Sequence, residues 1–160
     1  MTDSTQETPS SSKTALILLG CPKIPIQTSL VLYLAHRLKQ TNIHTTIAGT
    51  PAARQLIRVA DPAGHYIEEL MDLDACIDEL AEEKRKPDST FVYIHNDAGI
   101  SYAATVQALC ATRLYVLIFG ENASQLEELI EFPCTIIADS SMHNPMKLKK
   151  KLENEAPWDV

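Results

Sequence analysis

Residues 14–20 read Thr-Ala-Leu-Ile-Leu-Leu-Gly, an apolar run that stops at a glycine. A run of this kind, without alternating polar residues, is typical of a strand that is covered on both faces of a sheet. The next segment places leucines four residues apart, after Thr28 or Ser29, either of which could cap a helix. This part of the chain therefore predicts a buried strand followed by an amphipathic helix that ends near Asn42.

The same unit of strand, turn and helix recurs along the rest of the chain. Asp72 or Asp74 could cap a helix that runs to about Lys86, and Ser124 with Glu127 forms a capping-box pattern. Further strands are expected at 43–48, 65–73, 90–94, 114–119 and 134–138. The alternation predicts a three-layer α/β/α fold with a mostly parallel, doubly wound sheet of five or six strands, Rossmann-like or flavodoxin-like.

The ends and the composition of the chain suggest its organisation and location. Residues 1–13 are rich in Ser and Thr and predict a disordered tail, which leaves 14–160 as a single α/β domain. The tail has no apolar segment like that of a signal peptide, and the four cysteines are far apart without a C-x-x-C pair. We therefore expect a cytoplasmic protein with reduced thiols and no structural zinc site.

Charge and hydropathy exclude two large classes of partner. The formal net charge of -7 disfavours a nonspecific nucleic-acid binder, because such proteins use Lys and Arg to neutralise phosphates. The apolar runs are as long as strands and fall far short of the roughly 20 residues that cross a bilayer, so no membrane association is expected. A local site for one small anion remains compatible with this composition, since it needs only a few amide groups and one or two cations.

Polar residues gather in the loops that follow the predicted strands. In a doubly wound sheet these loops meet at one edge, where ligands bind. The residues at this edge predict a small anionic or nucleotide-like ligand, with Lys23 or Arg54 as its counter-charge. Glu121 and other acidic residues in the same loops disfavour a polyphosphate. Neither G-x-G-x-x-G nor the P-loop pattern is present, so no cofactor can be named. The candidate ligand-binding residues are Gly20, Cys21, Gln27, Thr28, Gly49, Arg54, Asn96, Asp97, Gly120 and Asp139.

Catalysis at the same edge is an alternative interpretation. Cys21 lies between a strand and a helix, where a thiol can become a nucleophile or a metal ligand, although a thiol in such a place more often fills space beside a proline. His95 and Asp97 are candidates for acid/base work, and with Asp139 and His143 they could converge on a metal ion. Loop His and Asp residues more often close turns or cap helices, so no metal site is predicted. Ser101 with His95 or His143 could suggest hydrolase chemistry, but no G-x-S-x-G motif supports it, and Ser101 would serve equally well as a helix cap.

Four motifs carry a resemblance to a known family. They are LGCP at 19–22 with the following Pro, Gln and Thr, AGTPAAR at 48–54, VADP at 59–62 and MDLD at 71–74. With them the chain resembles a small methanogen-associated archaeal family of uncharacterised α/β proteins, a domain of unknown function. The resemblance implies a three-layer α/β fold and a methanogen setting, and it implies no activity and no catalytic residues.

Three functions thus remain open from the sequence. The leading hypothesis is a small-molecule or anion-binding protein that is accessory to methanogen metabolism. The alternatives are an enzyme that depends on Cys21 or on His95 and Asp97, and a subunit that docks to another protein. A homodimer is expected only because two-fold dimers are the commonest oligomers.

Overall fold

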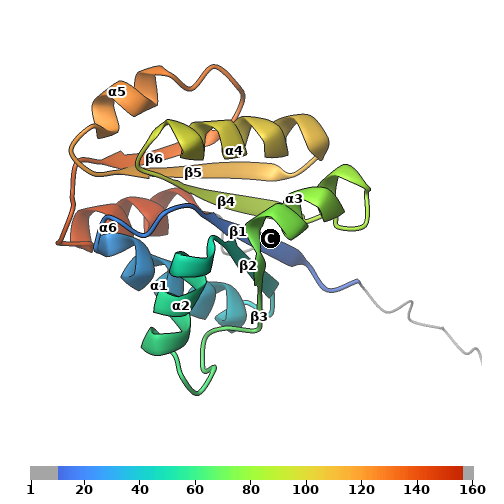
Figure 1. Ribbon diagram of the computed structural model, residues 1–160. Helices are drawn as coiled ribbons and strands as arrows, with labels where there is room; N and C mark the ends of the chain where they lie inside the picture. The colour runs from blue at the N-terminus through green and yellow to red at the C-terminus, as the bar shows by residue number, and fades with distance from the viewer. Residues whose placement is uncertain (1–10, 157–160) are drawn as a thin grey trace, which may run out of the picture.

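A computed structural model describes residues 11–156, and strands and helices alternate throughout this range (Figure 1). The predicted tail lies mostly outside the described residues. No helix in the described range is long and apolar enough to cross a membrane. The elements, in order, are β1 (Thr14–Leu19), α1 (Ile26–Gln40), β2 (His44–Gly49), α2 (Pro51–Ala60), β3 (Glu69–Asp72), α3 (Leu73–Ala81), β4 (Ser89–Ile94), α4 (Asp97–Leu109), β5 (Arg113–Phe119), α5 (Ala123–Glu128), β6 (Thr135–Asp139) and α6 (Met146–Glu155).

The strands form one sheet in the order β3-β2-β1-β4-β5-β6, and every neighbouring pair is parallel. This is the Rossmann order, in which the chain builds outward from β1 in one direction and then returns to the other side of β1 with β4. The predicted three-layer fold is confirmed. Of its two variants, the Rossmann-like one is observed.

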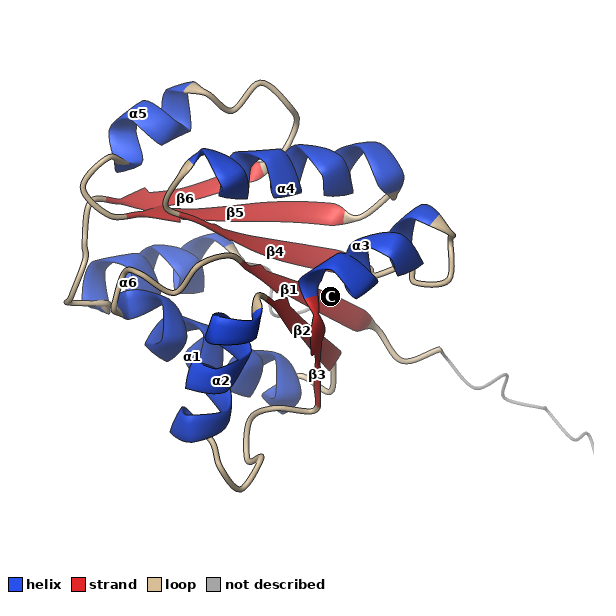
Figure 2. Ribbon diagram, in the orientation of Figure 1, coloured by secondary structure: helices blue, strands red, loops and turns tan. Residues whose placement is uncertain are grey.

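Helices cover both faces of the sheet (Figure 2). One face packs under α1, α2 and α6, and the other under α3, α4 and α5. Alternate residues of β1 enter the two cores: Ile17 and Leu19 face one core, while Leu16 and Leu18 face the other. All four are at most 1 % exposed. This double burial explains why the 14–20 run contains no alternating polar residue.

Several helix boundaries differ from the sequence-based expectations. Helix α1 begins at Ile26, before Thr28 and Ser29, and no side chain caps it. Its start is instead held by the loop after β6, because the amide of Ile26 donates to the carbonyl of Met142 at 3.2 Å. The expected capping box of Ser124 is also wrong, since α5 begins at Ala123 without a side-chain cap.

The third helix is shorter than predicted. Asp72 does cap α3, because its carboxylate accepts hydrogen bonds from the amides of Asp74 and Ala75. The helix nevertheless ends at Ala81 and not near Lys86. Glu83 adopts a positive φ of 57°, a left-handed conformation that turns the chain away from the helix axis.

Ser101 is not a helix cap, which corrects another expectation. It lies inside α4, and the cap is Asn96, whose side-chain oxygen accepts a hydrogen bond from the amide of Gly99. Gly99 also allows a close approach of helix and strand. A Cβ atom at this position would lie 3.0 Å from the Cα of Ile94, so a larger residue would push α4 away from β4.

Candidate functional site

The strand order creates a switch point between β1 and β4. These strands lie side by side, but the helices that follow them cover opposite faces of the sheet. The loops that leave the two strands therefore diverge and leave room between them, which is where open α/β sheets bind ligands. Figure 1 shows the loop after β1 passing along this edge toward the start of α6.

A cleft of about 330 Å³ opens at this switch point. Four loops contribute to it, namely those that follow β1, β4, β5 and β6. Their side chains combine an amine, a carboxylate, amides and an imidazole with a few apolar groups. The lining residues are Cys21, Lys23, Ile24, His95, Asn96, Gly120, Glu121, Asn122 and Met142.

Hydrogen bonds between the loops hold the cleft in shape. The Nε2 atom of His95 lies 2.5 Å from the carbonyl oxygen of Cys21, which ties the loop after β4 to the loop after β1. The amide of Gly120 donates to the carbonyl of Ser141 at 3.0 Å and ties the loops after β5 and β6. Gly120 has a φ of 94°, which a side chain would disfavour.

Asp139 holds the loop after β6 in place and does not line the cleft. Its carboxylate accepts hydrogen bonds from the amide and the hydroxyl of Ser141, and it pairs with Lys151. Burial alone would raise the pKa of Asp139, but the Ser141 hydrogen bonds and the nearby lysines outweigh it and hold the pKa below its ordinary value. Asp139 is thus a charged anchor for the loop that reaches Gly120.

The structure brings some of the predicted residues together and separates others. Of the ten ligand-binding candidates, three line the cleft: Cys21, Asn96 and Gly120. The guanidinium of Arg54 donates to Asp72 and to the carbonyl of Gly49, each at 3.1 Å, and so is engaged within the protein. The candidates outside the cleft lining are Gly20, Gln27, Thr28, Gly49, Arg54, Asp97 and Asp139.

Six lining residues were not among the ligand-binding candidates, and one of them, His95, was a catalytic candidate. Lys23 and Glu121 were noticed only as charges near the edge, and the sequence gives no separate signal for Ile24, Asn122 or Met142. Met142 follows the last strand by three residues. A search of each loop for every side chain, apolar ones included, could have found it.

The catalytic candidates do not form a nucleophile and base pair in this structure. Cys21 is exposed. The imidazole of His95 bonds with the backbone carbonyl of Cys21 and its ring packs 5.6 Å from that of Phe119. Asp97 and His143 are exposed and line no part of the cleft. Within residues 11–156, no three His, Cys, Asp or Glu side chains are grouped so that they could hold a metal ion.

The other three cysteines pack against the core under α3, α4 and α5. Burial raises the pKa of the Cys76 thiol to about 12 and raises the pKa of Cys110 and Cys134 in the same direction. These thiols therefore stay protonated and apolar in character, as expected of cysteines that fill space.

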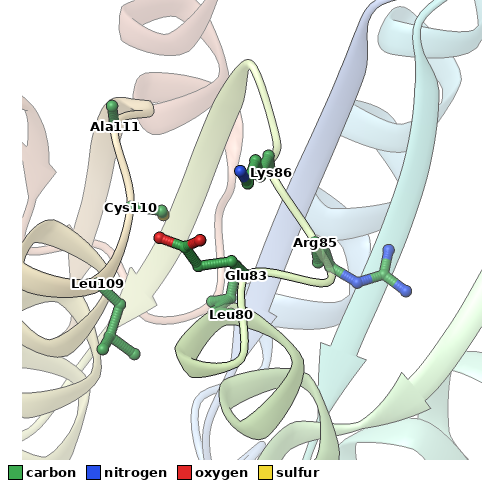
Figure 3. Close-up of a pocket in the computed structure, with 7 residues that line it drawn as sticks. All are labelled: Leu80, Glu83, Arg85, Lys86, Leu109, Cys110 and Ala111. Atoms are coloured by element: carbon green, nitrogen blue, oxygen red, sulfur yellow. The ribbon is translucent and has the colours of Figure 1, made fainter.

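A smaller hollow of about 220 Å³ lies at the opposite edge of the sheet (Figure 3). It is lined by residues from the ends of α3 and α4, among them Leu80, Glu83 and Cys110. Arg85 also lines it, but the figure shows its guanidinium pointing away from the other labelled side chains. That guanidinium donates hydrogen bonds to Thr46, Glu69 and Glu79, so its N–H groups are engaged within the protein.

Comparisons with known proteins agree with this architecture. The model of a family described as "Domain of unknown function (DUF1890)" matches residues 16–155. The chain belongs to this family. A relative in the methanogen Methanocaldococcus jannaschii, "Uncharacterized protein MJ0452", is 30 % identical over 140 residues, which are 86 % of this chain and 93 % of the relative.

A solved structure shows the same fold. The chain described as "Structure of MT0777" is 36 % identical, superposes with a TM-score of 0.82, and the match covers 91 % of this chain and 100 % of that one. The archaeal, methanogen-associated family suggested by the four motifs is therefore confirmed, and the comparisons name no ligand or reaction.

Proposed function

We propose that this DUF1890 protein binds a small metabolite that carries one anionic group and several hydroxyl or amino groups, such as a nucleoside monophosphate or a phosphosugar. The observation that carries the proposal is the cleft of about 330 Å³ at the β1/β4 switch point. Its volume lies at the lower end of the range for small-molecule sites, and its position is the one where this strand order binds ligands in other proteins.

The charges in the cleft favour one anionic group over a polyphosphate. Lys23 supplies the cationic charge of the lining, while Glu121 supplies a negative charge. The first amides of α1 offer little to a phosphate, because Ile26 donates to Met142 and Gln27 donates to Ile24. A single phosphate or carboxylate near Lys23, with hydroxyl groups toward Glu121 and Asn122, fits this arrangement.

The enzymatic alternatives have weaker support at this cleft. A thiol nucleophile needs a base within hydrogen-bond reach, and His95 instead bonds with the backbone carbonyl of Cys21. Ligand binding without catalysis requires no such pair, so we favour a binding function over an enzymatic one.

Thermal melting of the purified protein tests the proposal. The probes are AMP, ribose 5-phosphate, inorganic phosphate and divalent metal salts, and the matched variants are Lys23→Ala in the cleft and Lys86→Ala at the opposite edge. We expect at least one phosphorylated probe to raise the melting temperature of the wild type and of Lys86→Ala, but not of Lys23→Ala. A wild type that melts normally and responds to none of the probes would contradict the proposal.

A further inference from the structure

Two buried polar groups have no hydrogen-bond partner among the described residues. They are the side-chain oxygen of Gln27 and the hydroxyl of Tyr93, and each residue is only 1 % exposed. Such groups are rare in folded proteins, because they lose their bonds to water on burial and gain nothing in return. Each therefore calls for a physical explanation.

Both groups lie on the same face and at the same end of the sheet as the cleft. Tyr93 stands in β4 opposite Leu19 of β1, two residues before His95, and belongs to the core under α1 and α6. Gln27 stands in the first turn of α1, and the bond from Ile26 to Met142 holds that turn against the loop after β6.

Apolar side chains of the cleft wall lie in the same core as Tyr93. Ile24 lines the cleft and is also a member of this core, and Met142 lines the cleft and packs against the core from outside. Ile24 comes from a loop without regular structure, whose link to β4 is the bond between His95 and Cys21. Ile24 therefore connects the wall of the cleft to the core that contains Tyr93.

We propose that the ligand of this cleft carries a hydroxyl group that passes Ile24 and pairs with both Gln27 and Tyr93. The ligand hydroxyl donates to the Oε1 atom of Gln27 and accepts from the hydroxyl of Tyr93, so each group finds its missing partner. The inference rests on the proposed function and states which group of the ligand the site selects. A ligand without that hydroxyl leaves two buried groups unpaired and is rejected, which is the strongest form of discrimination that a binding site can achieve.

The stability of conservative variants without any ligand gives the first test. Tyr93→Phe and Gln27→Met remove the unpaired groups and keep the volume nearly unchanged, so both should melt about 2 °C or more above the wild type. The matched control is Tyr115→Phe, because Tyr115 lies in the same core on the neighbouring strand and its hydroxyl is not one of the buried groups without a partner. This control should melt at or below the wild-type temperature.

Binding of AMP and of 2′,3′-dideoxy-AMP, measured by calorimetry, gives the second test. The wild type should prefer AMP at least tenfold, and Tyr93→Phe and Gln27→Met should reduce that preference to less than threefold. Tyr115→Phe should keep the wild-type preference.

The outcomes separate the two proposals. A wild type that binds neither nucleotide, and none of the other phosphorylated probes, contradicts the proposed function and this inference with it. A wild type that binds AMP while Tyr93→Phe and Gln27→Met keep the full preference contradicts the inference alone. Variants that melt below the wild type, as when the two groups hold an internal water, also contradict it.

Discussion

Three polar residues of the cleft and two at the amino edge of the sheet differ in whether they have partners within the protein. At the carboxyl edge, Lys23, Glu121 and Asn122 line the cleft, and among the described residues none of their side chains makes a hydrogen bond or an ion pair. At the amino edge, Arg85 donates to three side chains. Asp61 there is 5 % exposed and accepts hydrogen bonds from the amides of three consecutive residues.

This difference separates groups that stabilise the fold from groups that can receive a ligand. A buried charge that is fully paired contributes to stability, and its removal is costly. An exposed polar group without partners contributes little, and its removal is nearly neutral. Substitutions of the paired residues at the amino edge should therefore change the free energy of unfolding, whereas substitutions of the unpaired residues in the cleft should change ligand binding.

The largest loss of stability is expected at Asp61. Asp61→Ala leaves three backbone amides of the loop before β3 without their acceptor, so the free energy of unfolding should fall by about 3 kcal/mol. The measurement is urea unfolding at neutral pH. Asp78→Ala, at an exposed position of α3, should change stability by less than about 0.5 kcal/mol. Equal effects of the two substitutions would remove the distinction on which the comparison rests.

The Asp61 contribution should also depend on pH. Burial alone would raise the pKa of this carboxyl, but the amide hydrogen bonds from Tyr66, His65 and Ile67 outweigh it and lower the pKa. The carboxylate therefore stabilises the fold at pH values above the pKa of an unfolded aspartate, and this stabilisation is lost as the pH falls through the lowered pKa. The difference in stability between the wild type and Asp61→Asn should shrink in that acidic range, and a constant difference would contradict the assignment.

Arg85 should show an intermediate effect. Arg85→Met leaves the carboxylates of Glu69 and Glu79 without their cation, so we expect a loss of about 2 kcal/mol in urea unfolding. Its neighbour Lys86 lines the same hollow and is exposed, so Lys86→Met is the matched control and should cost less than about 0.5 kcal/mol. An Arg85→Met protein as stable as the control would show that the network contributes nothing.

A small gain is expected at Glu83. Its φ of 57° places a side chain in the left-handed region, so Glu83→Gly should relieve strain and raise the free energy of unfolding by about 1 kcal/mol. The adjacent Glu82 has an ordinary φ of -84°, and Glu82→Gly should lower stability instead. Opposite signs for two neighbouring substitutions are the expected outcome, and a loss at both positions would contradict it.

The fold was predictable because its signals are local and repeated. The apolar run at 14–20, the turn before Pro51 and the run at 90–94 each report burial or chain reversal without reference to the rest of the molecule. Helix ends were less predictable. The start of α1 depends on a bond to Met142, more than a hundred residues away, and no local pattern reports that contact.

The edge of the sheet that holds the cleft could be predicted from the sequence, but the residues that line the cleft could not. Arg54 follows a strand and looks available in the sequence, yet Asp72 at the end of the neighbouring strand binds its guanidinium. Gln27 looks like a loop residue and is buried in the first turn of α1. Strand order decides which loops meet, and a sequence without its relatives does not contain that order.

The most direct test of the central claim is where a ligand binds. The measurement is a titration of ¹⁵N-labelled protein with AMP, followed by the amide signals of the backbone. Binding at the switch point should shift the amide signals of Cys21, Lys23 and Ile24, and those of 95–96 and 120–122, and leave those of the amino-edge hollow, such as 83–86, unchanged. Shifts confined to 83–86, or no shift at any amide, would contradict the account.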